Sequence, residues 1–187
     1  MYFQLGYDYP KDEQDGHYMI EDGIDFDGVK SWALGKPFNA QLPNPISVTL
    51  APIGGFSGKP PEMFDEYMCL MSAKMIDVLK KSGVDNIEVF PAKLVDGPNS
   101  RTFDYFAVNI IGMVAAADLG KSEWENLDGE PKIDTAFTTL VVNPDKARGL
   151  PIFRLAESTG TILVHERIKS ALEASGLETL RFSETSG

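Results

Sequence analysis

The sequence predicts an α+β protein with a mixed or largely antiparallel sheet, two main short helices and a repeated strand–helix–strand unit. The repeat is visible in the sequence: SAKMIDVLKKSGVDNIEVF covers residues 72–90, and HERIKSALEASGLETLRF covers residues 165–182. A shorter copy of the unit lies between them. A further segment is apolar on both faces, which is typical of a central, covered strand.

Residues 1–59 predict an irregular, acidic region with short strands. Residues 1–5 and the alternating, β-branched segment 45–52 (PISVTLAP) are typical of strands. Gly, Asp and Pro dominate the stretch between them, where we expect weaker strands near 17–20 and 31–34. We expect this region and an α+β domain over 60–187 to form one continuous globular unit.

Residues 61–82 allow two interpretations. One long amphipathic helix would explain the helical spacing of five apolar residues, Phe64, Met68, Met71, Met75 and Leu79. The second copy favours a different structure, because its β-branched TILV predicts a strand that leads directly into a helix. We therefore prefer a strand over 67–71, Ser72 as the N-cap, and a helix over 73–81.

The second copy predicts a helix over 166–174 with His165 in the N-cap position, where it is a weaker cap than Ser. A base placed at a helix start is the functional alternative for His165. Gly83 and Gly176 follow the two helices and can adopt the left-handed conformation that ends a helix. Strands over 86–91 and 178–183 should come next.

The segment between the copies predicts the central strand, within residues 101–118. Phe106, Val108 and Ile110 fall on one face of that strand, and Tyr105, Ala107, Ile111 and Met113 fall on the other. Beyond it we expect a loop over 121–132, with or without a helical turn, a strand over 135–143 and a strand over 151–156. A short helix between these two strands should begin after Asn143, with Pro144 in its first turn, and end at Gly149.

Composition excludes several classes of site. Cys69 is the only cysteine, so neither an internal disulfide nor a Cys-based zinc site can form, and two histidines far apart in the sequence argue against a His-rich metal site. No apolar run reaches the roughly 18 residues of a membrane helix, and the N-terminus lacks the features of a secretory signal. We expect a cytoplasmic protein.

The net charge is −11, and the segment 1–30 contains eight acids against two lysines. Such a balance repels nucleic acid and favours a basic partner, or serves solubility alone. Trp32 and Trp124 lie in Gly-rich or acidic loops, where each either anchors the loop on the core or contacts a partner.

No motif indicates catalysis or a cofactor. In IGGFSGKPP the phosphate-loop spacing fails, because Ile53 stands in place of the first Gly and Pro60 follows Lys59. In the calcium-like DGIDFDG, Gly23 takes the place of the first ligand, so the calcium-loop pattern fails. We expect no enzyme, no metal and no cofactor.

Three segments resemble a family of bacterial polymorphic-toxin immunity proteins. These are the capped helix that precedes the strand Ile87–Pro91, the Tyr105–Asn109 strand that leads to the turn Asp118–Ser122, and the Phe153-Arg154 strand before the final helix. The resemblance covers residues 60–183 and is loose before them. His165 departs from the family pattern, where Ser is usual.

The resemblance implies a protein that binds and neutralises a cognate toxin by occluding its active site. A toxin with a basic cleft would suit the acidic N-terminal segment, from which we predict a partner-binding surface made of Asp22, Asp25, Phe26, Asp27 and Trp32. The alternative is a regulatory or small-ligand-binding α+β domain without catalysis. A hydrolase that uses carboxylates is a third interpretation, for which no constellation of residues stands out.

Overall fold

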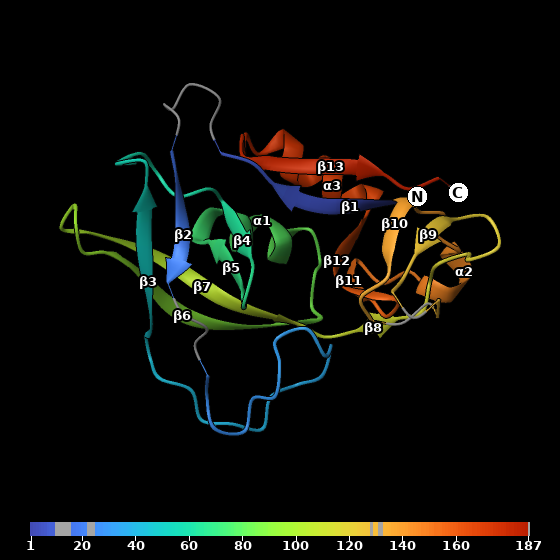
Figure 1. Cartoon of the computed structure of the whole chain (residues 1–187), viewed down its shortest axis with the longest axis horizontal. Helices are drawn as coiled ribbons and strands as arrows, with labels where there is room; N and C mark the ends of the chain where they lie inside the picture. The colour runs from blue at the N-terminus through green and yellow to red at the C-terminus, as the bar shows by residue number, and fades with distance from the viewer. Residues whose placement is uncertain (10–15, 22–24, 128, 131–132, 187) are drawn as a thin grey trace.

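The computed structural model of the chain describes residues 1–9, 16–21, 25–127, 129–130 and 133–186. It is an α+β fold in which two short helices lie between two mixed, mostly antiparallel sheets (Figure 1). The predicted fold class is therefore confirmed. None of the helices in these residues has the length and hydropathy needed to span a membrane.

The larger sheet has six strands, and the second has five. In spatial order the larger one contains β2 (His17–Glu21), β3 (Ile46–Ile53), β6 (Ile87–Asp96), β7 (Arg101–Ile110), β5 (Cys69–Ser72) and β4 (Met63–Asp65). The second contains β13 (Leu180–Glu184), β1 (Tyr2–Tyr7), β12 (Ser158–His165), β11 (Ile152–Leu155) and β8 (Met113–Val114). Strands from the N-terminal region 1–59 thus belong to both sheets.

The remaining elements are a separate two-stranded sheet and three helices. They are β9 (Glu123–Glu125), β10 (Ala136–Thr139), α1 (Ala73–Lys81), α2 (Pro144–Ala147) and α3 (Glu166–Ala174). Between the described strands of the two large sheets, only β3–β6 and β8–β11 pair in parallel.

The two similar sequence segments form the same structural unit. In the first, α1 connects β5 to β6, and both strands flank β7, which is antiparallel to each. In the second, α3 connects β12 to β13, and both flank β1 in the same way. Even the register corresponds, because Ser72 is paired with Tyr105 and His165 with Tyr2. The repetition in the sequence is therefore a repetition of scaffold.

The two helices pack against each other in the central core. Their apolar stripes supply five fully or nearly buried side chains, Met75, Ile76, Leu79, Ile168 and Leu172. Ser72 Oγ accepts a hydrogen bond from Met75 N at 3.2 Å, and Gly83 follows the helix with φ of +78°. The strand–cap–helix interpretation is confirmed, although β5 begins at Cys69, and the single long helix is excluded.

Strand β7 is central and covered on both faces, as predicted. Phe106, Val108 and Ile110 pack in the core that contains the helices. Tyr105 and Ala107 point to the other face, into a second core built around the aromatic residues of the N-terminal half. This second core holds the segment 25–45 against the sheet.

Two predictions in the loops are wrong. Residues 31–34 form turns instead of a strand, because Ser31 Oγ accepts the Ala33 N–H at 3.1 Å and Gly35 follows with φ of +64°. The expected loop over 121–132 contains β9, which pairs with β10. The strand expected over 135–143 is limited to β10, and the short helix α2 forms as predicted with Asn143 as its cap.

Candidate partner-binding surface

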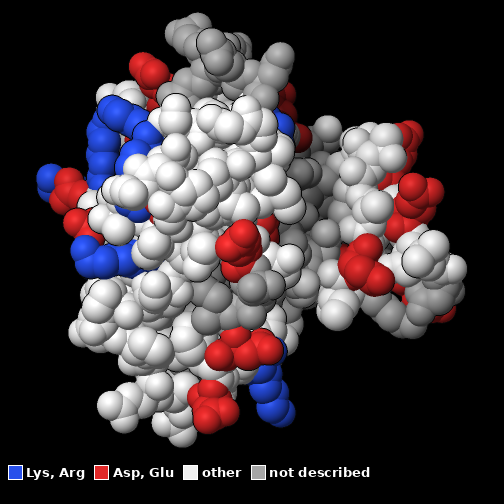
Figure 2. All heavy atoms as spheres, turned by 60° about the vertical axis from the view of Figure 1, so that its left-hand side comes forward, with Lys and Arg blue, Asp and Glu red and all other residues white. Residues whose placement is uncertain are grey.

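Acidic residues are concentrated in two segments of the chain. Besides the segment 1–30, the segment 118–134 contains six acids against two lysines, which leaves the rest of the chain close to neutral. In Figure 2, several acidic side chains lie on the projecting lobe at the right, which carries β9 and β10 in Figure 1. Others lie on the central and lower part of the same face, whereas basic side chains gather mainly at the left edge.

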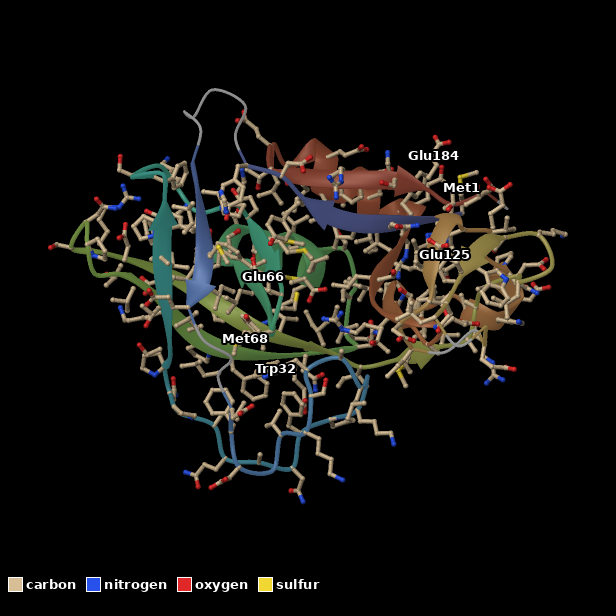
Figure 3. All side chains as sticks on the ribbon, viewed as in Figure 1. Met1, Trp32, Glu66, Met68, Glu125 and Glu184 are labelled. Carbon is tan, nitrogen blue, oxygen red and sulfur yellow. The ribbon has the colours of Figure 1, made fainter. Side chains whose placement is uncertain are left out.

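The segment 25–45 is anchored by an aromatic cluster. Trp32 is only 5% exposed and meets Phe38 edge-on with ring centroids 4.8 Å apart. Phe90 of β6 and Phe26 lie 6.0 Å and 6.4 Å from the same indole ring. Figure 3 shows Trp32 at the junction between this loop and the sheet. Such edge-to-face contacts fix the position of the loop more strongly than its Gly-rich sequence would suggest.

Polar contacts tether the middle of the same loop, at residues 35–38. Asn109 of β7 donates from Nδ2 to the Lys36 carbonyl and to Glu88 Oε2, each at 2.8 Å. Glu88 Oε2 also accepts the Phe38 N–H at 3.0 Å. The Gly35 carbonyl accepts the Gly112 N–H at 2.9 Å. These contacts fix the conformation of the loop before any partner binds. Less conformational entropy of the loop is therefore lost on binding.

The structure separates the five predicted contact residues into different environments. Asp25 and Asp27 are exposed, and Phe26 between them is half-buried. Trp32 is buried. Its ring therefore anchors the loop on the core and is not part of the exposed surface that carries Asp25 and Asp27. Asp22 lies outside the described residues.

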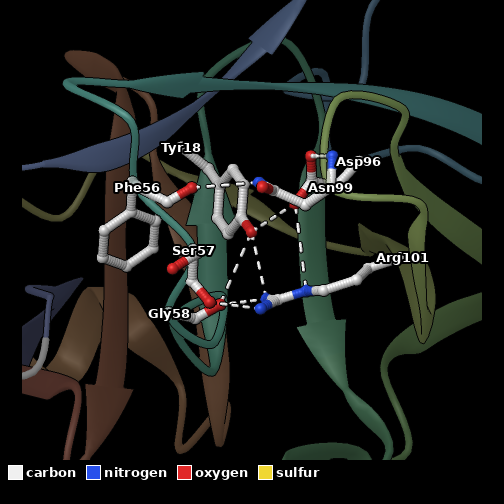
Figure 4. Close-up of polar contacts among 7 residues, drawn as sticks. All are labelled: Tyr18, Phe56, Ser57, Gly58, Asp96, Asn99 and Arg101. Carbon is white, nitrogen blue, oxygen red and sulfur yellow. Dashed lines mark hydrogen bonds and ion pairs between the residues drawn. The ribbon is translucent and has the colours of Figure 1, made fainter.

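A buried polar network holds a second loop, residues 55–58, which follows β3 at the opposite end of that strand from the 25–45 loop (Figure 4). Tyr18 donates to Asp96 Oδ2 at 2.7 Å, and Asn99 Nδ2 donates to the same carboxylate oxygen at 2.8 Å. Arg101 donates to the Ser57 and Gly58 carbonyls and to Tyr18 Oη. These side chains bond to one another and to the loop backbone, so the arrangement is suited to holding a loop.

A depression of about 490 Å³ lies beside this network. Residues of β2, β3 and β6 form its floor, and the turn between β6 and β7 forms its rim. Glu21, Thr49 and Asn99 supply its polar side chains. A ligand-binding domain would be expected to enclose its ligand in a deep, mainly apolar pocket.

The described residues contain no cluster of three or more His, Cys, Asp or Glu with the geometry of a metal site. Cys69 is fully buried in β5, and burial raises the pKa of its thiol well above the ordinary value, so it is poorly suited to act as a nucleophile. His165 accepts the Arg167 N–H through Nδ1 at 3.3 Å, which is the capping role.

Sequence reasoning did not identify the acidic segment 118–134 as a candidate surface. The signal was present, because this short segment contains six acids together with Trp124. Its composition is typical of a loop, so only the density of its charge could have indicated a surface.

Comparison with known proteins gives one family. The family model described as "Immunity protein family (Imm11)" matches residues 8–186, which is nearly the whole chain and includes the N-terminal region. No curated protein matches the chain.

Proposed function

Because the chain belongs to the Imm11 family of immunity proteins, we propose that it acts in the cytoplasm as a non-catalytic inhibitor that binds a cognate toxin and occludes its active site. Beyond family membership, the proposal rests on one observation. The molecule has an acidic face, and the 25–45 loop is fixed in position by the core. The toxin would be a bacterial effector whose active-site cleft is basic.

The physical argument rests on charge and rigidity. Toxins that act on nucleic acids or nucleotides need positive charge in their clefts, and an acidic surface is attracted to such a cleft over distances of about 10 Å at moderate salt. Asp25 and Asp27 present carboxylates on a loop that Trp32 and Phe38 hold in place. Complementary charge increases the association rate, and a preformed loop limits the entropic cost of binding.

The experiment uses the polypeptide encoded next to this gene, which is where a cognate toxin gene is expected. The two proteins should co-purify as a stable complex, and co-expression should restore growth to cells that produce the toxin. Absence of binding and absence of protection would contradict the proposal and favour the regulatory or ligand-binding alternative.

The contact surface is tested separately by the triple variant D22N/D25N/D27N. It should bind the toxin more slowly, by about tenfold at low salt, and its rate should depend less on salt concentration than the wild-type rate. The matched control is E173Q/E178Q, which removes two exposed acids outside both acidic segments. An unchanged affinity in the triple variant would refute this placement while leaving the inhibitor function intact.

A further inference from the structure

The β9–β10 hairpin has one anchored face and one unpartnered face. Trp124 and Phe137 are cross-strand neighbours, and both are half-buried. Trp124 Nε1 donates to the Leu119 carbonyl at 3.3 Å, while Leu119 and Phe137 pack on the core of the second sheet. A two-stranded ribbon is marginally stable alone, so these contacts hold the hairpin.

The opposite face carries charge into solvent. Glu125 is paired with Ala136 across the ribbon, and both side chains are exposed, as is that of Glu123. Among the described strands, no third strand pairs with this two-stranded sheet.

The segment beyond the ribbon exposes two large aliphatic residues. Leu127 is 104% exposed and Ile133 is 63% exposed, the two highest values among the large apolar residues of the described chain. Asn126 Nδ2 donates to Asp134 Oδ1 at 2.8 Å, which closes the base of the segment that carries them. Leu127 is fully exposed and Ile133 is mostly exposed, so neither side chain contributes much burial to the fold.

Acidic residues flank this apolar pair in the sequence. Glu123, Glu125, Glu130 and Asp134 are exposed on the ribbon and its connection. Interfaces commonly combine an apolar anchor with a polar rim, and the rim contributes mainly to association rate and partner selection. The lobe has this composition on a projecting part of the molecule (Figure 2).

Resting on the proposed function, we infer that the β9–β10 lobe is a second contact element for the same toxin. Leu127 and Ile133 enter an apolar pocket on the toxin, and basic residues around that pocket pair with the acidic rim of the lobe. The toxin is thereby held at two places, by the 25–45 loop and by this lobe.

Charge selects the toxin over other occupants. A second copy of this chain would bring the same acidic rim against itself, and an anionic membrane surface would be repelled in the same way. A basic protein surface with an apolar pocket satisfies both the aliphatic residues and the carboxylates.

The test separates the apolar and the charged contributions, with the toxin encoded by the neighbouring gene as the probe. L127S/I133S removes the apolar anchor and keeps the charge, whereas E123Q/E125Q/E130Q removes charge and keeps the anchor. Y67S, at a residue that is 57% exposed in another part of the chain, and E173Q/E178Q are the matched controls. All variants alter exposed side chains, so their melting temperatures should match the wild type.

We expect L127S/I133S to weaken binding by about 10- to 100-fold, chiefly through faster dissociation and with little dependence on salt. The triple Gln variant should slow association by about tenfold at low salt. The difference should disappear at about 0.5 M salt, where the Debye length is only about 4 Å and screening is strong.

Two outcomes overturn the inference in distinguishable ways. If the wild type binds the toxin and both lobe variants bind with wild-type kinetics, the lobe is not a contact element while the proposed function stands. If the wild type itself fails to bind or protect, the proposed function falls and this inference falls with it.

Discussion

Arg154 in β11 and Asp65 in β4 form a two-point ion pair that joins the two large sheets. Arg154 Nη2 lies 2.6 Å from Asp65 Oδ1, and Nη1 lies 3.1 Å from Oδ2. The two side chains are 3% and 12% exposed, and Nη1 also donates to the Thr159 carbonyl at 2.9 Å. The arginine of the Phe153-Arg154 strand therefore connects the two halves of the fold.

Removal of one partner from this pair should be strongly destabilising. Asp65→Asn leaves a buried guanidinium without a countercharge, so we expect the free energy of unfolding to fall by about 3–5 kcal/mol. Urea denaturation measures this loss. The control is Asp104→Asn in the Lys93–Asp104 pair, whose side chains are 50% and 83% exposed and whose loss should cost below about 1 kcal/mol. Equal effects of the two substitutions would show that the buried pair does not join the sheets energetically.

Asp96 gives a prediction about pH. Burial alone would raise the pKa of this carboxyl, but hydrogen bonds from Tyr18 and Asn99 and the charge of Arg101 outweigh burial and lower it. An unfolded Asp has a pKa of about 3.9. Because the folded-state pKa is lower, ionised Asp96 contributes stability above about pH 4 and loses that contribution as the pH falls through its folded pKa.

Comparison of the wild type with Asp96→Asn isolates this contribution. The difference in unfolding free energy should be constant between about pH 5 and 7 and should shrink below about pH 4. Denaturant titrations at a series of pH values measure it. A difference that stays constant down to the lowest pH at which both proteins fold would contradict this role for Asp96.

Gly35 is required by a close approach between backbones. With φ of +64°, a Cβ added at this position would lie 2.7 Å from both Gly112 C and Met113 N. Gly55 has a similar φ of +73° but no atom within 4 Å of the added Cβ. Gly55→Ala should therefore lower the free energy of unfolding only by the strain of an alanine in the left-handed conformation, about 1–2 kcal/mol.

Gly35→Ala should lower the free energy of unfolding by about 1–3 kcal/mol more than Gly55→Ala does, because the added methyl group separates the 25–45 loop from the β7–β8 connection. Thermal unfolding of both variants measures the difference, and toxin binding by Gly35→Ala reports whether the displaced loop still presents its surface. Identical melting temperatures for the two variants would contradict the close approach.

The parts of the fold that could be predicted from the sequence are those set by local patterns. Helices α1 and α3 and their ends follow from apolar spacing, a capping residue and a following glycine. Strand β6 runs to Asp96, beyond the expected end at Pro91, because β7 pairs with it along its whole length and Pro91 is accommodated opposite Phe106. The extent of this pairing with the following strand cannot be read from the segment 86–91 alone.

The candidate surface was less predictable for the same reason. Trp32 stands in a Gly-rich loop, and its burial depends on Phe90, which lies far away in the chain. Strand β9 is only three residues long, and it forms because Trp124 meets Phe137 across the ribbon. Residue type and spacing indicate aromatic anchors and acidic segments, but the tertiary contacts decide which side chains reach solvent.

The cap of α3 leads to the last prediction. His165 Nδ1 accepts the Arg167 N–H at 3.3 Å, whereas in α1 the cap is the hydroxyl of Ser72. His165→Ser restores the stronger cap and should stabilise the protein by about 0.5–1 kcal/mol at neutral pH, measured by urea denaturation. Loss of the edge-on contact between His165 and Tyr2, whose ring centroids are 5.2 Å apart, reduces this gain.

The stability gained by His165→Ser should grow as the pH falls. Burial, the N-terminal amine and Arg167 lower the pKa of His165, opposed by Glu166. Only the neutral ring can accept at Nδ1, so the histidine cap contributes fully above the unfolded pKa of about 6.5 and is lost as the pH falls through the lower folded pKa. The advantage of His165→Ser should therefore increase between about pH 7 and 5, while Ser72→Ala costs about 1 kcal/mol throughout that range. A constant advantage would mean that the protonation of His165 is not coupled to the stability of α3.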